Sequence, residues 1–176
     1  MIQFFQQKGA KTGIKSLDIL ASYRDHRHDD RMIWSIFDIR AMLPDNLQLL
    51  HHQFDAGKYV LRFTDGRQKI DLYRWAPASF LLEGRDLIQF SKTIPEFAES
   101  EPLAVKIDGY QAAEWRLSPG TRWRRRWSRL KIKPSFFWLR LWLLEDQNRI
   151  LCVRAESKHP LDAHQLTRIC RDYESF

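Results

Sequence analysis

Residues 58–75 have the sequence KYVLRFTDGRQKIDLYRW, and this stretch decides the fold class of the chain. Apolar and polar side chains alternate on both sides of Asp65-Gly66, as they do in strands with one buried and one wetter face. Glycine accepts the positive φ that tight hairpin turns need, so Asp65-Gly66 is a strong hairpin signal. The stretch therefore predicts two antiparallel strands, 58–63 and 68–75.

The flanking sequence extends this hairpin into a larger sheet. Upstream, residues 47–54 complete a three-stranded meander through the turn Asp55-Ala56-Gly57, and 32–40 predicts one further strand. Downstream, four more strands are expected in two pairs, at 103–107 with 110–117 and at 136–144 with 149–156. Bulky side chains occupy both faces of 136–144, which predicts a central strand covered on both sides.

Two segments change from alternation to helical spacing. Leucine, isoleucine and phenylalanine side chains between 79 and 98 fit one helical face, which Pro95 should end or kink. At the C-terminus, Leu166, Ile169 and Tyr173 recur at i, i+3 and i+7. We therefore expect an α+β fold with a central antiparallel sheet of about six or seven strands. Helices near 80–98 and 160–174 should pack on that sheet.

Length and composition favour one folded domain. A chain of 176 residues with 44% apolar and 29% charged residues belongs with ordinary globular proteins rather than fibrous or disordered ones. Residues 1–31 are polar and irregular, apart from a short helix expected at 15–23. The predicted organisation is an N-terminal extension over 1–31 and a single α+β domain over 32–176.

The expected compartment is the cytoplasm. Cys152 and Cys170 fall in a predicted strand and helix, which suggests buried thiols in a reducing environment, although a disulfide between them stays open. Residues 1–8 lack the apolar run of a signal peptide. The longest apolar stretch, 136–144, is interrupted by Arg140 and is too short to span a bilayer. We expect a soluble protein without a transmembrane segment.

The order of the predicted elements resembles the PsbP-like fold. Three local features are similar: Leu43-Pro44 before the strand at 47, Asp108-Gly109 leading into a strand, and 149–153 followed by a C-terminal helix that ends at 173–176. The resemblance covers roughly residues 32–176. Proteins with this fold include a photosystem II extrinsic subunit and a Ran-binding nuclear import factor. The resemblance implies a binding or assembly module and supplies no catalytic motif.

Positive charge is concentrated in residues 122–133, RWRRRWSRLKIK. This stretch holds seven cations and no acid, which equals the net charge of +7 of the whole chain. Arginine pairs with carboxylate or phosphate, and tryptophan adds stacking. We expect a surface that binds an acidic protein or nucleic acid, with an anionic membrane as a further candidate. A solvated loop whose tryptophans cap the core is the alternative. We call the expected contact residues the Arg-Trp block: Arg122, Trp123, Arg124, Arg125, Arg126, Trp127, Arg129, Lys131 and Lys133.

Metal ligands are sought first in the charged segment His26, His28, Asp29 and Asp30. Nitrogen and carboxylate groups at this spacing suit zinc or another divalent ion. A hydrated loop explains the same residues, so no metal or other cofactor is assigned. His51 and His52 should point to opposite faces of a strand, so they cannot share one metal unless a bulge interrupts the strand.

Acid–base chemistry has two candidate pairs, His51 with Asp71 and Asp38 with Glu114. Their spacing is not diagnostic, because geometry is the first requirement for such a pair. The chain has no glycine-rich phosphate loop, nucleophile elbow or paired-cysteine zinc pattern. A non-enzymatic module is therefore preferred, and a small metal-dependent or acid–base enzyme with a His/Asp cleft is the alternative.

One strand face offers a further contact. Trp138, Arg140 and Trp142 share that face, which places a guanidinium between two indoles. Arg140 is expected either to stack on the tryptophans or to lie under a helix and reach an acid such as Glu114.

Overall fold

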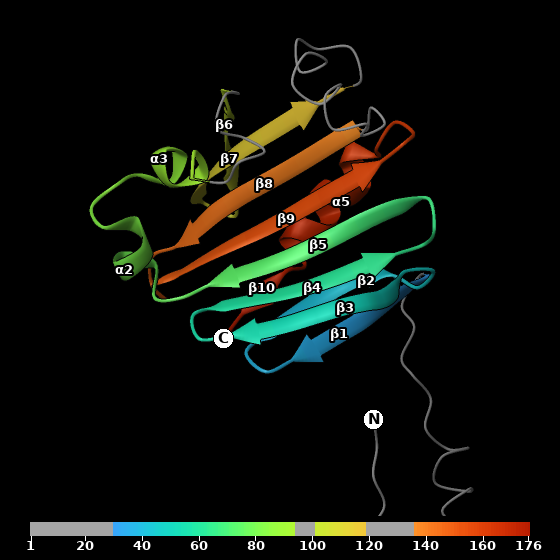
Figure 1. Ribbon diagram of the computed structural model, residues 1–176, viewed down its shortest axis with the longest axis horizontal. Coiled ribbons are helices and arrows are strands. Elements are labelled where there is room, and N and C mark those ends of the chain that lie inside the picture. Colours follow the sequence, from blue (N-terminus) through green and yellow to red (C-terminus); the bar gives the residue numbers. More distant parts are fainter. Residues whose placement is uncertain (1–29, 94–100, 119–135) are drawn as a thin grey trace, which may run out of the picture.

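The computed structural model of the chain describes residues 30–93, 101–118 and 136–176 (Figure 1). Its main element is a seven-stranded antiparallel sheet in the order β3-β4-β5-β9-β8-β7-β6, which confirms the predicted α+β class and the meander. The strands are β3 (Gln48–Asp55), β4 (Lys58–Thr64), β5 (Gln68–Trp75), β6 (Leu103–Ile107), β7 (Tyr110–Leu117), β8 (Phe136–Leu144) and β9 (Arg149–Ser157).

A second, three-stranded sheet corrects two sequence predictions. The single strand expected over 32–40 is a hairpin, β1 (Arg31–Ile36) and β2 (Ile39–Pro44), that turns at Phe37 and Asp38. Phe37 adopts the left-handed φ of 53° there, a conformation usually left to glycine or asparagine. The C-terminal helix α5 (Ala163–Arg171) ends earlier than expected, and β10 (Glu174–Ser175) pairs with β2.

The long helix predicted over 80–98 is wrong in its continuity. Two short helices, α2 (Ala78–Leu82) and α3 (Leu87–Ser91), are separated by Glu83 and Gly84, which have φ of 48° and 79°. A capping box begins α3: the Gln89 backbone N–H donates to Asp86 Oδ1 (2.7 Å), and the Asp86 N–H donates to Gln89 Oε1 (3.2 Å). Apolar spacing hid this interruption. Residues 94–98 lie outside the described part of the chain.

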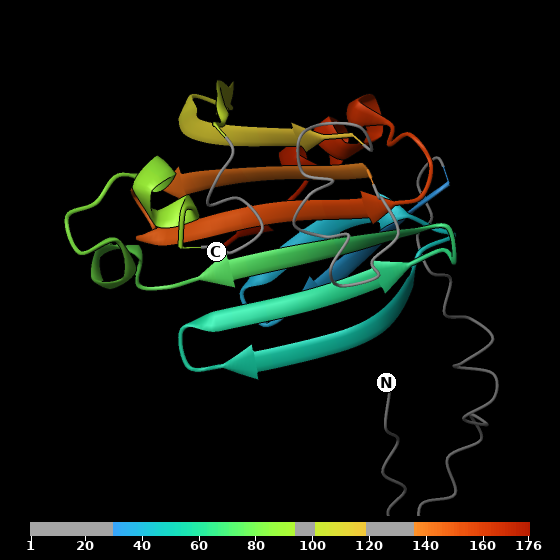
Figure 2. The same ribbon diagram turned by 45° about the horizontal axis from the view of Figure 1, so that its top comes forward.

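The large sheet separates two hydrophobic clusters. Its first face packs on α5 and the small sheet, which both lie behind it in Figures 1 and 2. The second face packs on α2 and α3 at one end. Neighbouring residues of β8 enter opposite clusters, since Trp138 and Leu139 are 2% and 1% exposed. This confirms β8 as a central strand covered on both sides.

A buried ion pair crosses the first face. Glu114 is fully buried and accepts a hydrogen bond from Arg140 Nε (2.7 Å), while Arg116 pairs with its other carboxylate oxygen. Arg140 also donates to Thr167 Oγ1 of α5 (3.2 Å), and its guanidinium lies 5.0 Å from the Trp138 ring centre. Arg140 therefore lies under a helix and reaches Glu114, while it also stacks on one tryptophan.

The two cysteine thiols lie inside the fold. Cys152 and Cys170 are buried and free, as predicted, and burial raises the pKa of both thiols. Among the helices of the described ranges, none is long and apolar enough to cross a bilayer. The helix expected at 15–23 lies outside the described ranges. Since residues 1–29 lie outside them as well, the division into an extension over 1–31 and a domain over 32–176 stays a prediction.

Candidate functional site

A row of charged side chains crosses the second face of the large sheet. The strand register places His51, Arg62, Asp71 and Arg154 opposite one another on β3, β4, β5 and β9. Side chains alternate between faces along a strand, so all four project to the same side. Leu139 of β8 pairs with Arg154 and belongs to the cluster on the second face, so the charged row lies on that face.

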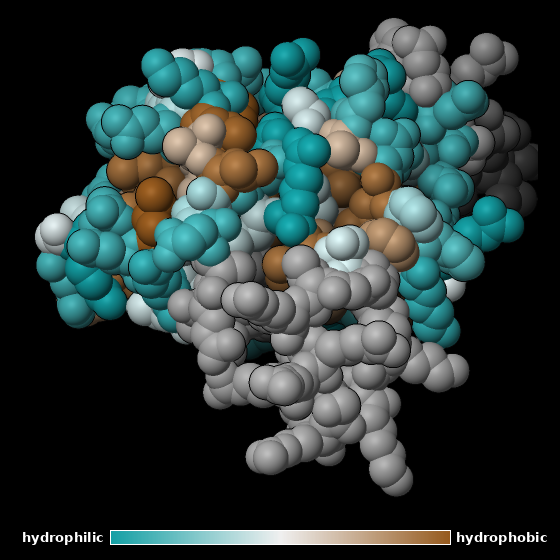
Figure 3. Space-filling model, turned by 90° about the horizontal axis from the view of Figure 1, so that it is seen from above, coloured by the Kyte–Doolittle hydropathy of each residue, from teal (hydrophilic) through white to brown (hydrophobic). Residues whose placement is uncertain are grey.

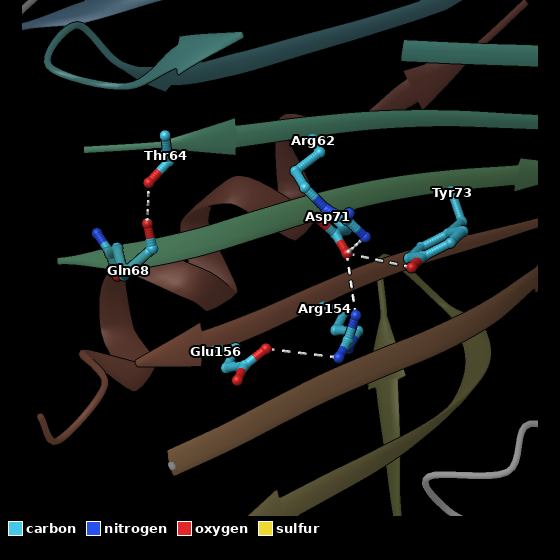
Figure 4. Close-up of polar contacts among 7 residues, drawn as sticks. All are labelled: Arg62, Thr64, Gln68, Asp71, Tyr73, Arg154 and Glu156. Carbon is cyan, nitrogen blue, oxygen red and sulfur yellow. Dashed lines mark hydrogen bonds and ion pairs between the residues drawn. The ribbon is translucent and has the colours of Figure 1, made fainter. Parts of the chain in front are cut away.

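Asp71 is the centre of this row (Figure 4). Arg62 donates to both carboxylate oxygens, from Nε to Oδ1 (2.8 Å) and from Nη2 to Oδ2 (3.0 Å). Arg154 Nη1 (3.1 Å) and the Tyr73 hydroxyl (3.2 Å) donate to Oδ2 as well. With Asp71 only 3% exposed, these bonds form a charge-assisted network that holds both guanidinium groups in place.

The network shifts the proton equilibria of its donors. The hydrogen bond to Asp71 raises the pKa of Arg62 above its ordinary value, so this guanidinium stays charged. Burial, together with the Asp71 charge, raises the pKa of Tyr73 to about 12. The Tyr73 hydroxyl therefore remains a neutral donor throughout the physiological pH range.

A cavity opens beside the network at one end of the sheet. Its volume is about 170 Å³, and we call it the polar pocket, lined by Arg62, Lys69, Asp71, Arg154 and Glu156. Arg154 Nη2 forms an ion pair with Glu156 at 3.6 Å, and the Arg154 guanidinium lies 5.5 Å from the Phe137 ring centre. The lining residues comprise three cations and two acids, a chemistry suited to charged groups rather than apolar ligands.

The polar pocket lies at the end of the sheet where the Arg-Trp block is attached. Lys69 pairs with Glu156, Glu156 with Phe137, and Phe137 with Leu117 in one continuous row. Leu117 ends β7 and Phe136 begins β8, and these residues flank the segment that contains the block. The block itself, residues 122–133, lies outside the described residues.

The residues considered for metal binding lie mostly outside the described part of the chain. His26, His28 and Asp29 lie outside the described residues, and Asp30 is exposed. Within 30–93, 101–118 and 136–176, no group of three or more histidine, cysteine, aspartate or glutamate side chains is arranged to hold a metal ion. His51 and His52 pair with Arg62 and Leu61, so they do lie on opposite faces of β3.

The proposed acid–base pairs are likewise not formed. The strand β4 separates His51 from Asp71, and Arg62 on that strand holds the Asp71 carboxylate. Asp38 forms ion pairs with Arg74 and with Arg149, the latter at 3.2 Å. Glu114 forms an ion pair with Arg140. Each of the three candidate acids, Asp38, Asp71 and Glu114, is therefore part of an ion pair with arginine.

Among the described residues, apolar surface at the β6–β7 edge is divided rather than continuous (Figure 3). Seen along this edge, hydrophobic side chains form two separate patches with hydrophilic ones between them (Figure 3). Leu103 of β6 and Ile88 of α3 are 58% and 37% exposed. Scattered apolar side chains of this kind are normal on protein surfaces.

Sequence reasoning missed most of the polar pocket. The hairpin turn at 65–66 would have placed Arg62 opposite Asp71, because turn position sets the register. Arg154 and Glu156 come from β9, which pairs with β5 although Arg154 follows Asp71 by 83 positions in the sequence. No local sequence pattern predicts the pairing of β5 with β9.

The half-buried Tyr73 gives a testable pH dependence. Its folded-state pKa of about 12 lies above the ordinary value of 10.0, so its contribution to stability is complete below pH 10 and is lost as the pH rises toward 12. Urea unfolding at pH 8 and pH 11 should show a smaller loss of stability for Tyr73→Phe than for the wild-type protein. An equal loss in both proteins would contradict the raised pKa.

Comparison with known proteins supports the fold. No protein-family model and no curated protein matches the chain. Among solved structures, the Ran-binding protein Mog1p of Saccharomyces cerevisiae aligns with a TM-score of 0.53 and 10% identity, over 82% of this chain and 95% of that chain. A mutant of the protein Mog1 aligns with a TM-score of 0.50 and 8% identity, over 82% and 95%. At such identities the likeness shows the fold alone, and it agrees with the fold that the PsbP-like resemblance implied.

Proposed function

We propose that the chain is a non-enzymatic binding module whose Arg-Trp block contacts an acidic protein surface. The observation that carries the proposal is charge: seven cations within 122–133 account for the net charge of +7. Such a concentration raises the association rate with acidic partners and orients them toward one end of the molecule. Both thiols are free and buried, which fits a partner in the reducing cytoplasm.

The fold likeness and the described acids support a binding role. Mog1p, which shares the fold, is named as a Ran-binding protein, and we extend only the general property of protein binding to this chain. The acids considered for catalysis, Asp38, Asp71 and Glu114, are engaged by arginines and serve the architecture. Their engagement makes binding the simpler proposal.

An acidic protein is favoured over nucleic acid as the partner. Nucleic-acid readers commonly spread basic residues over one face and use a recognisable module. This chain places its excess charge in one connection between β7 and β8 and has an otherwise balanced sequence. Nucleic acid is therefore an alternative outcome of the binding test.

The binding test compares two triple variants of equal charge. In the block variant, Arg124, Arg125 and Arg126 become serine; in the control variant, the exposed cations Lys106, Lys158 and Arg168 become serine. Tryptophan fluorescence is followed while poly-glutamate or duplex DNA is added. We expect the block variant to bind poly-glutamate about tenfold more weakly than the control variant.

Two outcomes of this titration would contradict the proposal. Equal weakening in both variants would mean that net charge alone, and not the Arg-Trp block, sets the affinity. Tighter binding of DNA than of poly-glutamate, with a steep loss on addition of salt, would identify a phosphate-binding surface instead.

A further inference from the structure

The polar pocket contains two guanidinium groups that are already positioned. Arg62 and Arg154 are both held by the buried carboxylate of Asp71, at 2.8 to 3.1 Å. A ligand that binds there therefore does not have to order these long side chains, a step that otherwise costs free energy. Asp71 acts as an internal support for the pocket (Figure 4).

Donor groups remain for a ligand. The bonds of Arg62 to Asp71 use Nε and Nη2 and leave Nη1 outside this pairing, and the Arg62 side chain is 35% exposed. Lys69 is exposed and forms no ion pair with any residue of the described ranges, although it faces Glu156 across the β5–β9 pair. Lys69 is therefore available to bind a negatively charged group.

The charge of the pocket selects the ligand. Arg62, Lys69 and Arg154 contribute three positive charges, and Asp71 and Glu156 contribute two negative ones, so the lining formed by the described residues carries one net positive charge. A monoanionic carboxylate neutralises this charge, whereas a phosphate dianion would leave an excess negative charge beside Glu156. Asp71 and Arg154 are largely buried, and charges at such positions are most stable when they are balanced, which favours the carboxylate.

We propose that the polar pocket binds one carboxylate side chain of an acidic protein partner. The inference rests on the proposed function, since the pocket lies at the sheet end where the Arg-Trp block is attached. The pocket volume of about 170 Å³ has room for a carboxyl group and the methylenes that carry it. A planar carboxylate matches the donor geometry of a guanidinium, and the ammonium of Lys69 adds a charged donor without fixed geometry.

Glu156 gives the proposal an unusual signature. Its carboxylate pairs with Arg154 at 3.6 Å on the pocket wall and would repel an arriving carboxylate. Removal of this charge should therefore strengthen ligand binding, whereas removal of the Lys69 charge should weaken it. Lys106 serves as a matched control, because its strand β6 is four strand positions away from β5 in the sheet.

The test uses N-acetyl-glutamate α-amide, which has a single side-chain carboxylate, and N-acetyl-glutamine α-amide as its neutral counterpart. Backbone amide shifts of the pocket residues are followed by NMR in the full-length protein. The acidic probe should give saturable shifts that the neutral probe does not give. Lys69→Gln should weaken binding about two- to fivefold, Glu156→Gln should strengthen it by a similar factor, and Lys106→Gln should leave it unchanged.

Three outcomes would overturn the inference. The first is that the neutral probe gives the same shifts. The second is that Lys69→Gln affects binding no more than Lys106→Gln does. The third is that inorganic phosphate binds the wild-type pocket more tightly than the acidic probe. The block variant separates this inference from the proposed function. It should retain probe binding to within about twofold while it loses affinity for poly-glutamate, so either result can fail without the other.

Discussion

Replacement of Glu114 with alanine is expected to lower the free energy of unfolding by about 3–5 kcal/mol, because it leaves a buried guanidinium without its counter-charge. Glu114 is 0% exposed and Arg140 is 6% exposed, so water cannot replace the lost carboxylate without opening the structure. The bond to Thr167 at 3.2 Å offers Arg140 only a neutral acceptor. Urea unfolding, followed by tryptophan fluorescence and circular dichroism, measures the change.

Two further variants serve as controls for the effect of Glu114→Ala on stability. Glu145→Ala removes an exposed acid from the β8–β9 turn and should change the free energy of unfolding by no more than about 0.5 kcal/mol. The double variant Glu114→Leu/Arg140→Met replaces the pair with apolar side chains and should recover much of the lost stability. A loss below about 1 kcal/mol for Glu114→Ala would show that the ion pair is not buried as described.

Replacement of Asp71 with alanine is expected to cost about 2–4 kcal/mol, because Arg62 and Arg154 lose their shared carboxylate and repel each other. The cost should be smaller than that at Glu114, since the Arg62 side chain is 35% exposed and can turn to water. The same change should also weaken binding of the acidic probe, because the two guanidinium groups are no longer held in place.

The matched control for Asp71 is an acid on the same sheet. Asp55 on the edge strand β3 is exposed, and Asp55→Ala should alter the free energy of unfolding by about 0.5 kcal/mol at most. Equal losses for Asp71→Ala and Asp55→Ala in urea unfolding would show that the network of Figure 4 does not stabilise the fold.

The elements that could be predicted from the sequence are those bounded by recognisable turn residues. Gly57, Gly66 and Gly109 each have a positive φ between paired strands, and the three hairpins around them were expected from the sequence. The β1–β2 turn was missed because its left-handed position is occupied by Phe37, within an apolar run that contains no glycine or proline. The local signal pointed to one continuous strand, while tertiary pairing with β10 supports a hairpin.

The break between α2 and α3 was missed because the apolar residues on both sides of it keep helical spacing. Leu81, Leu82 and Leu87 fit one helical face, although Gly84 interrupts the chain between them. Glu83 and Gly84 take left-handed conformations, and Asp86 then begins a new helix with its own cap. A glycine followed two residues later by an N-cap residue is a stop and a start, which outweighs the apolar spacing.

Of the two candidate binding regions, the Arg-Trp block could be predicted from the sequence and the polar pocket could not. The seven cations of 122–133 are visible in the sequence as a cluster, and the partner they contact remains a proposal. The polar pocket depends on the pairing of β5 with β9, which brings Asp71 next to Arg154. Such long-range pairing is determined by the whole core and not by the residues of either strand alone.

Partner capture tests most directly the central proposal that the Arg-Trp block contacts an acidic protein. The wild-type protein, the block variant and the control variant are immobilised and exposed to the same lysate after nuclease treatment, and the retained proteins are identified by mass spectrometry. We expect one acidic protein to be retained by the wild-type and control proteins and lost from the block variant, with retention reduced by salt. Equal retention by all three proteins, or none by any, would contradict a binding role for residues 122–133.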